Sequence, residues 1–63
     1  MIDRITTNPE QMGGVPCIRG LRIPVSIILT LISERLSEDN IIELYPDMEK
    51  EDFSAILRFA ANN

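Results

Sequence analysis

The residues with the clearest capacity for chemistry lie in one loop, within the stretch from Gly13 to Val25. Two arginines follow a glycine pair there, and backbone N–H groups together with two guanidinium groups can hold an anion or a partner's carboxylate. The Gly-Lys-Ser/Thr sequence of a nucleotide-binding P-loop is absent. We therefore predict a rigid loop that binds an anion or a partner, formed by Gly13, Gly14, Pro16, Arg19, Gly20 and Arg22. The alternative is a structural turn whose arginines pair with acids of the same chain, such as Glu43 or Asp47.

No residue set in the sequence points to catalysis. Cys17 is the single cysteine and the chain has no histidine, so a thiol nucleophile would lack its usual base and a zinc site would lack ligands. A lone cysteine between Pro16 and Ile18 is typical of a small core residue. The carboxylates gather at the starts of predicted helices, where they favour the helix dipole. We expect no enzyme activity, no catalytic residue, no metal site and no cofactor.

Size and charge restrict the partners of this protein. The 63 residues form one domain at most, and a domain so small buries only about 60% of its unfolded surface. Residues 1–36 carry four arginines and three acids, whereas residues 37–63 carry two basic and seven acidic residues. An acidic C-terminal half repels nucleic acid. We find no apolar run of about 18 residues and no signal peptide, and one cysteine forms no internal disulfide, so we expect a cytoplasmic protein without membrane contact.

Short strands and turns precede the helices. Residues 4–6 and the alternating apolar residues of Leu21–Ile23 are predicted to pair as two short strands, joined by a long connection. Asn8 followed by Pro9 predicts one helical turn that Gly13 ends. We expect residues 1–23 to form this strand pair and the glycine-rich loop.

Three helices are predicted over residues 24–62. The first runs from Pro24 to Arg35, the second begins at the N-cap Ser37 and stops before Pro46, and the third begins at Glu49. The predicted fold is mostly α, a strand pair followed by a three-helix, helix-turn-helix-like bundle in the single domain 1–63. Helical spacing assigns these residues to the core: Val25, Ile28, Leu29, Ile32, Leu36, Ile41, Leu44, Tyr45, Phe53, Ile56, Leu57 and Ala60.

A second apolar row on the first helix suggests self-association. Ile27 and Leu31 lie off the core stripe, and the edge of the strand Leu21–Ile23 has no predicted partner. We therefore expect a homodimer whose interface contains Leu21, Ile23, Ile27 and Leu31.

The sequence closely resembles a small bacterial and archaeal family, the domain of unknown function family 433, which is grouped with VapB-type antitoxins. The match rests on the run from Gly13 to Val25, on an opening "DRIT", and on the segments Ser37–Ile42, Tyr45–Met48 and Glu51–Phe53. Leu21 and Glu49 stand where the family usually has threonine.

The resemblance implies an antitoxin-like, cytoplasmic binding module that silences a PIN-like ribonuclease toxin and acts on its own promoter. Such antitoxins often carry a toxin-wrapping tail, and we expect this protein to contact its toxin without one. The Arg19–Arg22 loop would enter the toxin's acidic site, where an arginine replaces a metal ion. The alternatives are a DNA-binding transcriptional regulator that uses the N-terminal arginines, and a small structural subunit of another complex. The acids at the start of the third helix argue against ordinary major-groove reading.

Overall fold

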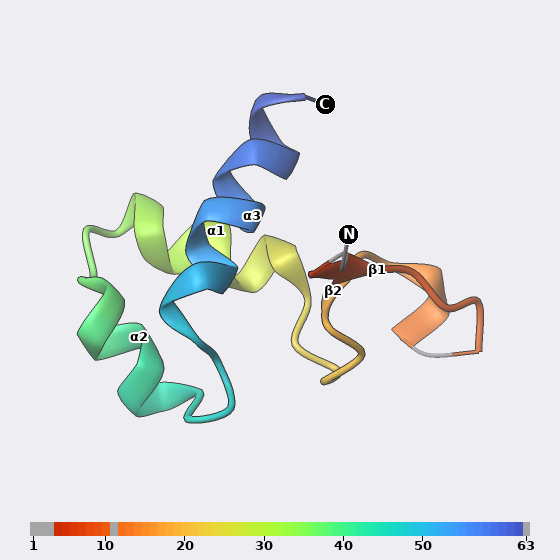
Figure 1. Ribbon diagram of the computed structural model, residues 1–63, viewed down its shortest axis with the longest axis horizontal. Coiled ribbons are helices and arrows are strands. Elements are labelled where there is room, and N and C mark those ends of the chain that lie inside the picture. The colour runs from red at the N-terminus through yellow and green to blue at the C-terminus, as the bar shows by residue number, and fades with distance from the viewer. Residues whose placement is uncertain (1–3, 11, 63) are drawn as a thin grey trace.

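The computed structural model describes residues 4–10 and 12–62 and contains a short strand pair followed by three helices. The elements in order are β1 (Ile5–Thr6), a 3-10 turn η1 (Met12–Gly14), β2 (Cys17–Ile18), α1 (Val25–Ser33), α2 (Glu38–Leu44) and α3 (Lys50–Ala61). The helix α1 packs against both α2 and α3, and the strand pair lies beside the start of α1 (Figure 1). The predicted fold class is therefore confirmed.

The second strand was predicted at the wrong place. β1 pairs in antiparallel fashion with β2, with Ile5 opposite Ile18, and not with Leu21–Ile23. Residues 19–22 form a tight loop instead, because the N–H of Ile18 donates to the carbonyl of Ile23 at 3.0 Å. Positive φ angles at three of these four loop residues prevent an extended strand there.

The glycine-rich segment before β2 also differs from the predicted helical turn. The Oδ1 atom of Asn8 accepts a hydrogen bond from the N–H of Glu10 at 2.9 Å, which is the local turn geometry that asparagine favours. The helical turn follows later, at η1, and contains Gly13 with a φ of 69°. Pro9 therefore belongs to a turn rather than to the start of a helix.

The helices begin and end by local rules. α2 starts at the predicted N-cap Ser37, whose Oγ accepts from the N–H of Asn40 at 3.1 Å. α1 ends at Ser33, earlier than predicted, because Arg35 adopts a φ of 68° and the N–H of Leu36 returns to the carbonyl of Leu31. This left-handed closing turn usually contains glycine.

The core lies between the strand pair and the three helices. Among the residues whose burial is described, nine apolar ones are buried: Cys17, Ile18, Ile23, Val25, Ile28, Ile41, Met48, Phe53 and Ile56. Leu29, Ile32, Leu36 and Tyr45 pack against this core with part of their surface exposed.

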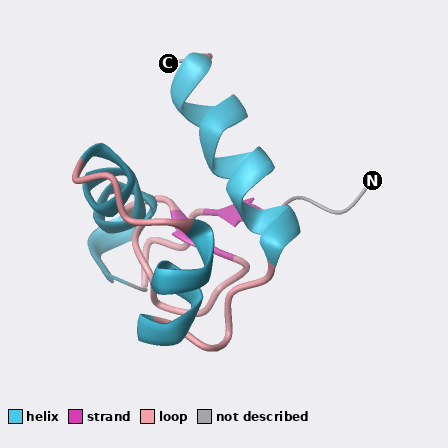
Figure 2. Ribbon diagram, turned by 90° about the vertical axis from the view of Figure 1, so that its left-hand side faces the viewer, coloured by secondary structure: helices cyan, strands magenta, loops and turns pink. Residues whose placement is uncertain are grey.

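Three predicted core residues lie outside the core. Leu44 is 59% exposed and Leu57 50% exposed, and Ala60 is also exposed. The last turns of α3 extend beyond the other elements in both views (Figure 1, Figure 2), and Leu57 and Ala60 remain exposed there although helical spacing assigned them to the core. Phe59, which is not among the predicted core residues, packs partly against the core.

Candidate functional site: a buried carboxylate and the arginine loop

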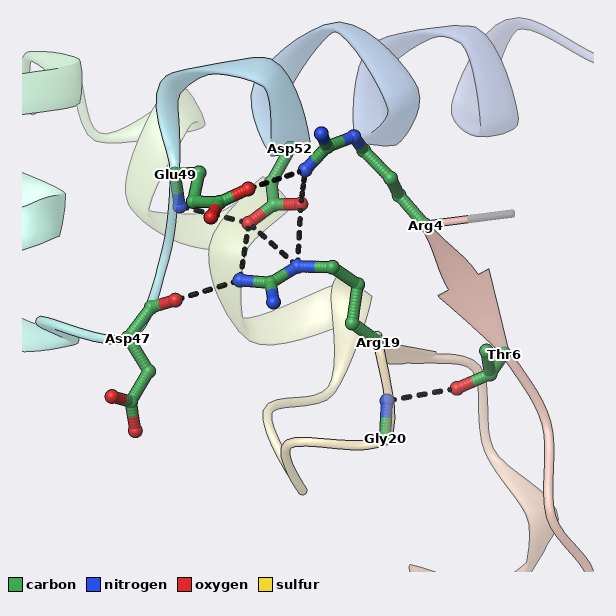
Figure 3. A network of polar contacts seen from close by, with 7 residues as sticks. All are labelled: Arg4, Thr6, Arg19, Gly20, Asp47, Glu49 and Asp52. Atoms are coloured by element: carbon green, nitrogen blue, oxygen red, sulfur yellow. Dashed lines mark hydrogen bonds and ion pairs between the residues drawn. The ribbon is translucent and has the colours of Figure 1, made fainter. Parts of the chain in front are cut away.

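The most unusual polar group of the fold is the carboxylate of Asp52 in the first turn of α3. Its side chain is 0% exposed. Arg4 Nη1 donates to Oδ1 at 3.0 Å, and Arg19 donates from Nε to Oδ1 and from Nη2 to Oδ2, both at 3.1 Å. The N–H of Glu49 donates to Oδ2 at 2.8 Å. Figure 3 shows the two guanidinium groups converging on this carboxylate. We call Arg4, Arg19, Glu49 and Asp52 the Asp52 cluster.

The electrostatics of the cluster favour the ionised carboxylate. Burial alone raises the pKa of Asp52, because it removes the charge from water. Hydrogen bonds from Arg19, the Glu49 backbone and Arg4 outweigh burial, so the pKa of Asp52 lies below its ordinary value of 3.8. Asp52 therefore remains charged at neutral pH and binds both arginines to α3.

The strand pairing explains why two arginines meet at this point. Arg4 precedes β1 and Arg19 follows β2, and antiparallel pairing brings these two strand ends together. The N–H of Arg19 donates to the carbonyl of Arg4 at 2.9 Å. The sequence analysis missed Arg4 and gave Asp52 only a helix-dipole role. The signal available was the three-residue spacing of Glu49 and Asp52, which is that of a capping box.

The side chain of Glu49 forms an ion pair with Arg4 at 2.8 Å. A threonine at this position would offer no charge to that arginine. The Asp52 carboxylate in turn accepts the N–H of the N-cap residue Glu49, which is the reciprocal contact of a capping box.

The residues of the predicted binding loop have different roles in the structure, and Arg19 and Gly20 have partners within the chain. Arg19 binds Asp52, and its Nη2 also donates to the carbonyl of Asp47 at 2.7 Å. The alternative of pairing with an acid of the same chain thus describes Arg19, although the acid is Asp52 rather than the carboxylates of Glu43 or Asp47. The N–H of Gly20 donates to Thr6 Oγ1 at 3.0 Å, as Figure 3 shows. Neither the Arg19 guanidinium nor the Gly20 N–H is therefore free to bind an external anion.

Arg22 differs from the remaining loop residues, because its side chain is exposed whereas they shape the backbone. Arg22 is exposed, and its guanidinium has no ion pair or hydrogen bond with residues 4–10 or 12–62. The carbonyl of Pro16 accepts from the N–H of Val25 at 3.0 Å. Gly13 and Gly14 both have positive φ angles. The proline and the two glycines therefore shape the backbone, and Arg22 is the predicted loop arginine that no described residue pairs with.

The residues predicted for a dimer interface differ in exposure. Ile23 is 8% exposed and belongs to the core, so its side chain has little surface for a second chain. Leu21 and Leu31 are partly buried against the same core. Ile27 is 41% exposed on α1.

Cys17 lies in the core with 1% exposure, and its thiol points at the carbonyl of Val15 at 3.4 Å. Over the described part of the chain, no three His, Cys, Asp or Glu side chains gather closely enough to hold a metal ion. None of the helices in residues 4–10 and 12–62 has the length and apolar run needed to cross a bilayer.

Together these features define a small strand-pair and three-helix domain whose first strand is bound to the last helix by a buried carboxylate. The chain belongs to the family described as "Protein of unknown function (DUF433)", whose sequence profile matches residues 5–60. It is similar to a DUF433 member protein from Anabaena variabilis, known from a crystal structure, with a TM-score of 0.88 and 28% identity over 97% of this chain and 60% of that one.

A second similarity is to the uncharacterized protein y4eO of Sinorhizobium fredii, which is 30% identical over 47 residues. The aligned part is 75% of this chain but only 21% of y4eO. The chain thus spans about a fifth of the curated relative and 60% of the solved one.

Proposed function

We propose that this protein is a non-enzymatic, antitoxin-like binding module that neutralises a partner ribonuclease toxin of the PIN-like type in the cytoplasm. The observation that supports it most is the surface of α2 and of the start of α3. Six acidic residues are exposed there, and two of them are paired within the chain, Asp39 with Lys50 and Glu49 with Arg4. The six are Glu38, Asp39, Glu43, Asp47, Glu49 and Glu51. Leu44, 59% exposed, lies among them. An acidic surface with an accessible leucine is suited to a basic protein partner with an apolar spot.

A ribonuclease has such a surface, because binding the phosphate backbone of RNA requires clustered positive charge. Complementary charge accelerates association and favours this partner over acidic competitors. An acidic module that covers the RNA-binding groove would block the substrate without any chemistry of its own. The chain has no histidine, and the only thiol is in the core.

The second candidate is a DNA-binding regulator, which the helix-turn-helix-like arrangement favours. In such a protein the first turn of the last helix contacts base edges. Here that turn contains Glu51 and the buried Asp52, and the arginines nearest to it are already paired. The charge of this turn therefore favours a protein partner over the major groove.

Co-expression with the product of the adjacent gene tests the proposal. We expect the neighbour alone to arrest growth and the wild-type module to restore it. Glu43→Lys combined with Asp47→Lys should weaken the rescue, whereas Glu34→Lys, an exposed acid at the end of α1, serves as the matched control. A neighbour that is harmless alone contradicts the toxin proposal, and tight, salt-sensitive gel shifts on upstream DNA by the module alone favour the regulator.

A further inference from the structure

Arg22 adopts a backbone conformation that its residue type disfavours. Its φ is 64°, and residues with a Cβ rarely adopt positive φ because the side chain crowds the backbone. Arg19 and Arg35 also have positive φ, at 44° and 68°. Each of these two has a role within the fold: Arg19 binds Asp52, and Arg35 occupies the left-handed closing turn of α1. Arg22 has no such contact with the described residues.

The loop that carries Arg22 is held at several points. The N–H of Ile18 donates to the carbonyl of Ile23 at 3.0 Å, and the N–H of Leu21 donates to the carbonyl of Ile18 at 2.7 Å. The N–H of Gly20 is bound to a threonine of β1. A loop held in this way presents its exposed side chain in a defined direction before a partner arrives, which lowers the entropy cost of binding.

The Asp52 cluster supports this loop further, through Arg19. Figure 3 shows the side chain of Arg19 leaving this loop and meeting Asp52 on α3. The carboxylates of Glu49 and Asp52 together balance the charges of Arg4 and Arg19, whereas no described residue pairs with Arg22. Strained backbone positions cluster at functional and ligand-binding sites, which makes the exposed Arg22 a candidate for binding.

The chemistry of a guanidinium restricts its ligand to a carboxylate or a phosphate, both of which it can bind with two parallel hydrogen bonds. Nucleic acid binding requires several phosphate contacts, and this loop offers one available cation on a chain of net charge −4. A carboxylate can be bound by one guanidinium alone, through two parallel hydrogen bonds, so a carboxylate fits Arg22 better than nucleic acid does.

We infer that Arg22 is a binding residue for a carboxylate group of a partner protein, and that the Asp52 cluster positions it through Arg19. The inference deepens the proposed function and rests on it for the partner being a protein. In a metal-dependent ribonuclease, the carboxylates that hold the metal ions are ligands of the required chemistry.

The test is an NMR titration of ¹⁵N-labelled protein with a synthetic hexaglutamate peptide at low salt. We expect the peptide to shift the Nε–H resonance of Arg22 and the amides of its loop. Arg22→Gly should raise the melting temperature, because glycine adopts positive φ without strain. The same substitution should weaken peptide binding at least about fivefold. The peptide affinity of Arg22→Lys should lie between those of the wild type and Arg22→Gly.

Arg35→Gly is the matched control, since it relieves positive φ at another exposed arginine. It should raise the melting temperature while changing peptide affinity less than about twofold. Equal losses of affinity in the two glycine variants would overturn the inference. So would larger Arg22 shifts with inorganic phosphate or with a short DNA duplex than with the peptide.

The peptide titration uses no toxin. A harmless neighbouring gene product would therefore contradict the proposed function without changing the result expected at Arg22. A peptide that leaves Arg22 unshifted would overturn the inference while the co-expression result stands.

Discussion

Asp52→Asn removes the charge on which the polar cluster depends. In the wild-type protein this fully buried carboxylate accepts hydrogen bonds from Arg4, Arg19 and the N–H of Glu49. Asparagine keeps one acceptor oxygen, but its amide group directs two donors toward guanidinium groups that are also donors. The variant therefore replaces attraction with a donor–donor conflict and leaves both arginines without their buried counter-ion.

The expected loss of stability follows from burial and from the exposure of the partners. Breaking a buried ion pair by removing one member costs about 3–5 kcal/mol. The side chains of Arg4 and Arg19 are 30% and 26% exposed, so water partly solvates them after the pair is broken. We therefore expect the lower end of that range, about 3 kcal/mol. A domain of this size has about 3–9 kcal/mol in total, so the variant should retain about 0–6 kcal/mol at 25 °C.

Urea denaturation at pH 7, followed by far-ultraviolet circular dichroism, measures this loss. Glu51→Gln is the matched control, because it removes a charge from the same helical turn but from an exposed side chain. The control should change the free energy of unfolding by less than about 0.5 kcal/mol. A loss below about 1 kcal/mol for Asp52→Asn, or equal losses in both variants, would refute the assigned role of the buried carboxylate.

Three further predictions concern pH, packing and assembly. Because the pKa of Asp52 is lower in the folded protein than its ordinary value of 3.8, its ion pairs stabilise the fold above that pH, and the contribution is lost as the pH falls through the lower folded-state pKa. Urea midpoints measured from pH 5 to about 2 should therefore fall less steeply in Asp52→Asn than in the wild type. Ile28→Ala should cost about 2–5 kcal/mol in the same assay, because Ile28 is 0% exposed, whereas Ile27→Ala at a 41% exposed site should cost far less. We also predict a homodimer at micromolar concentration that Ile27→Glu with Leu31→Lys converts to a helical monomer by light scattering; a monomeric wild type would contradict this.

The sequence was sufficient for the helices because helix signals are local. Ser37 lies three residues before the N–H that it caps, and Pro46 ends α2 through its own fixed geometry. The apolar spacing also identified Ile28 and Phe53 as core residues, because each lies on the face of its helix that packs against other elements. The spacing was misleading for Leu57, because periodicity indicates a face of a helix and not how far the neighbouring elements reach.

Within the arginine loop, the sequence indicated which residues carry charge but not which partner each charged side chain contacts. Arg19 and Arg22 are of one type and lie three residues apart, yet one binds a buried carboxylate and the other is exposed. The difference depends on where the fold places each residue: Arg19 directly follows β2 and its side chain meets Asp52 on α3, whereas Arg22 lies further along the loop. No pattern of neighbouring residue types distinguishes these two placements.

The sequence by itself determined the helix starts, the apolar stripes and the absence of histidine chemistry, because these depend on residues within a few positions of one another. Only the tertiary structure decided the strand pairing and the Asp52 cluster. Arg4 and Arg19 are separated from Asp52 by 48 and 33 residues. Their meeting requires the antiparallel pairing of β1 and β2 and the packing of α3 beside them. The free energy of those contacts comes from burying Ile18, Phe53 and their neighbours together, which is a property of the whole chain.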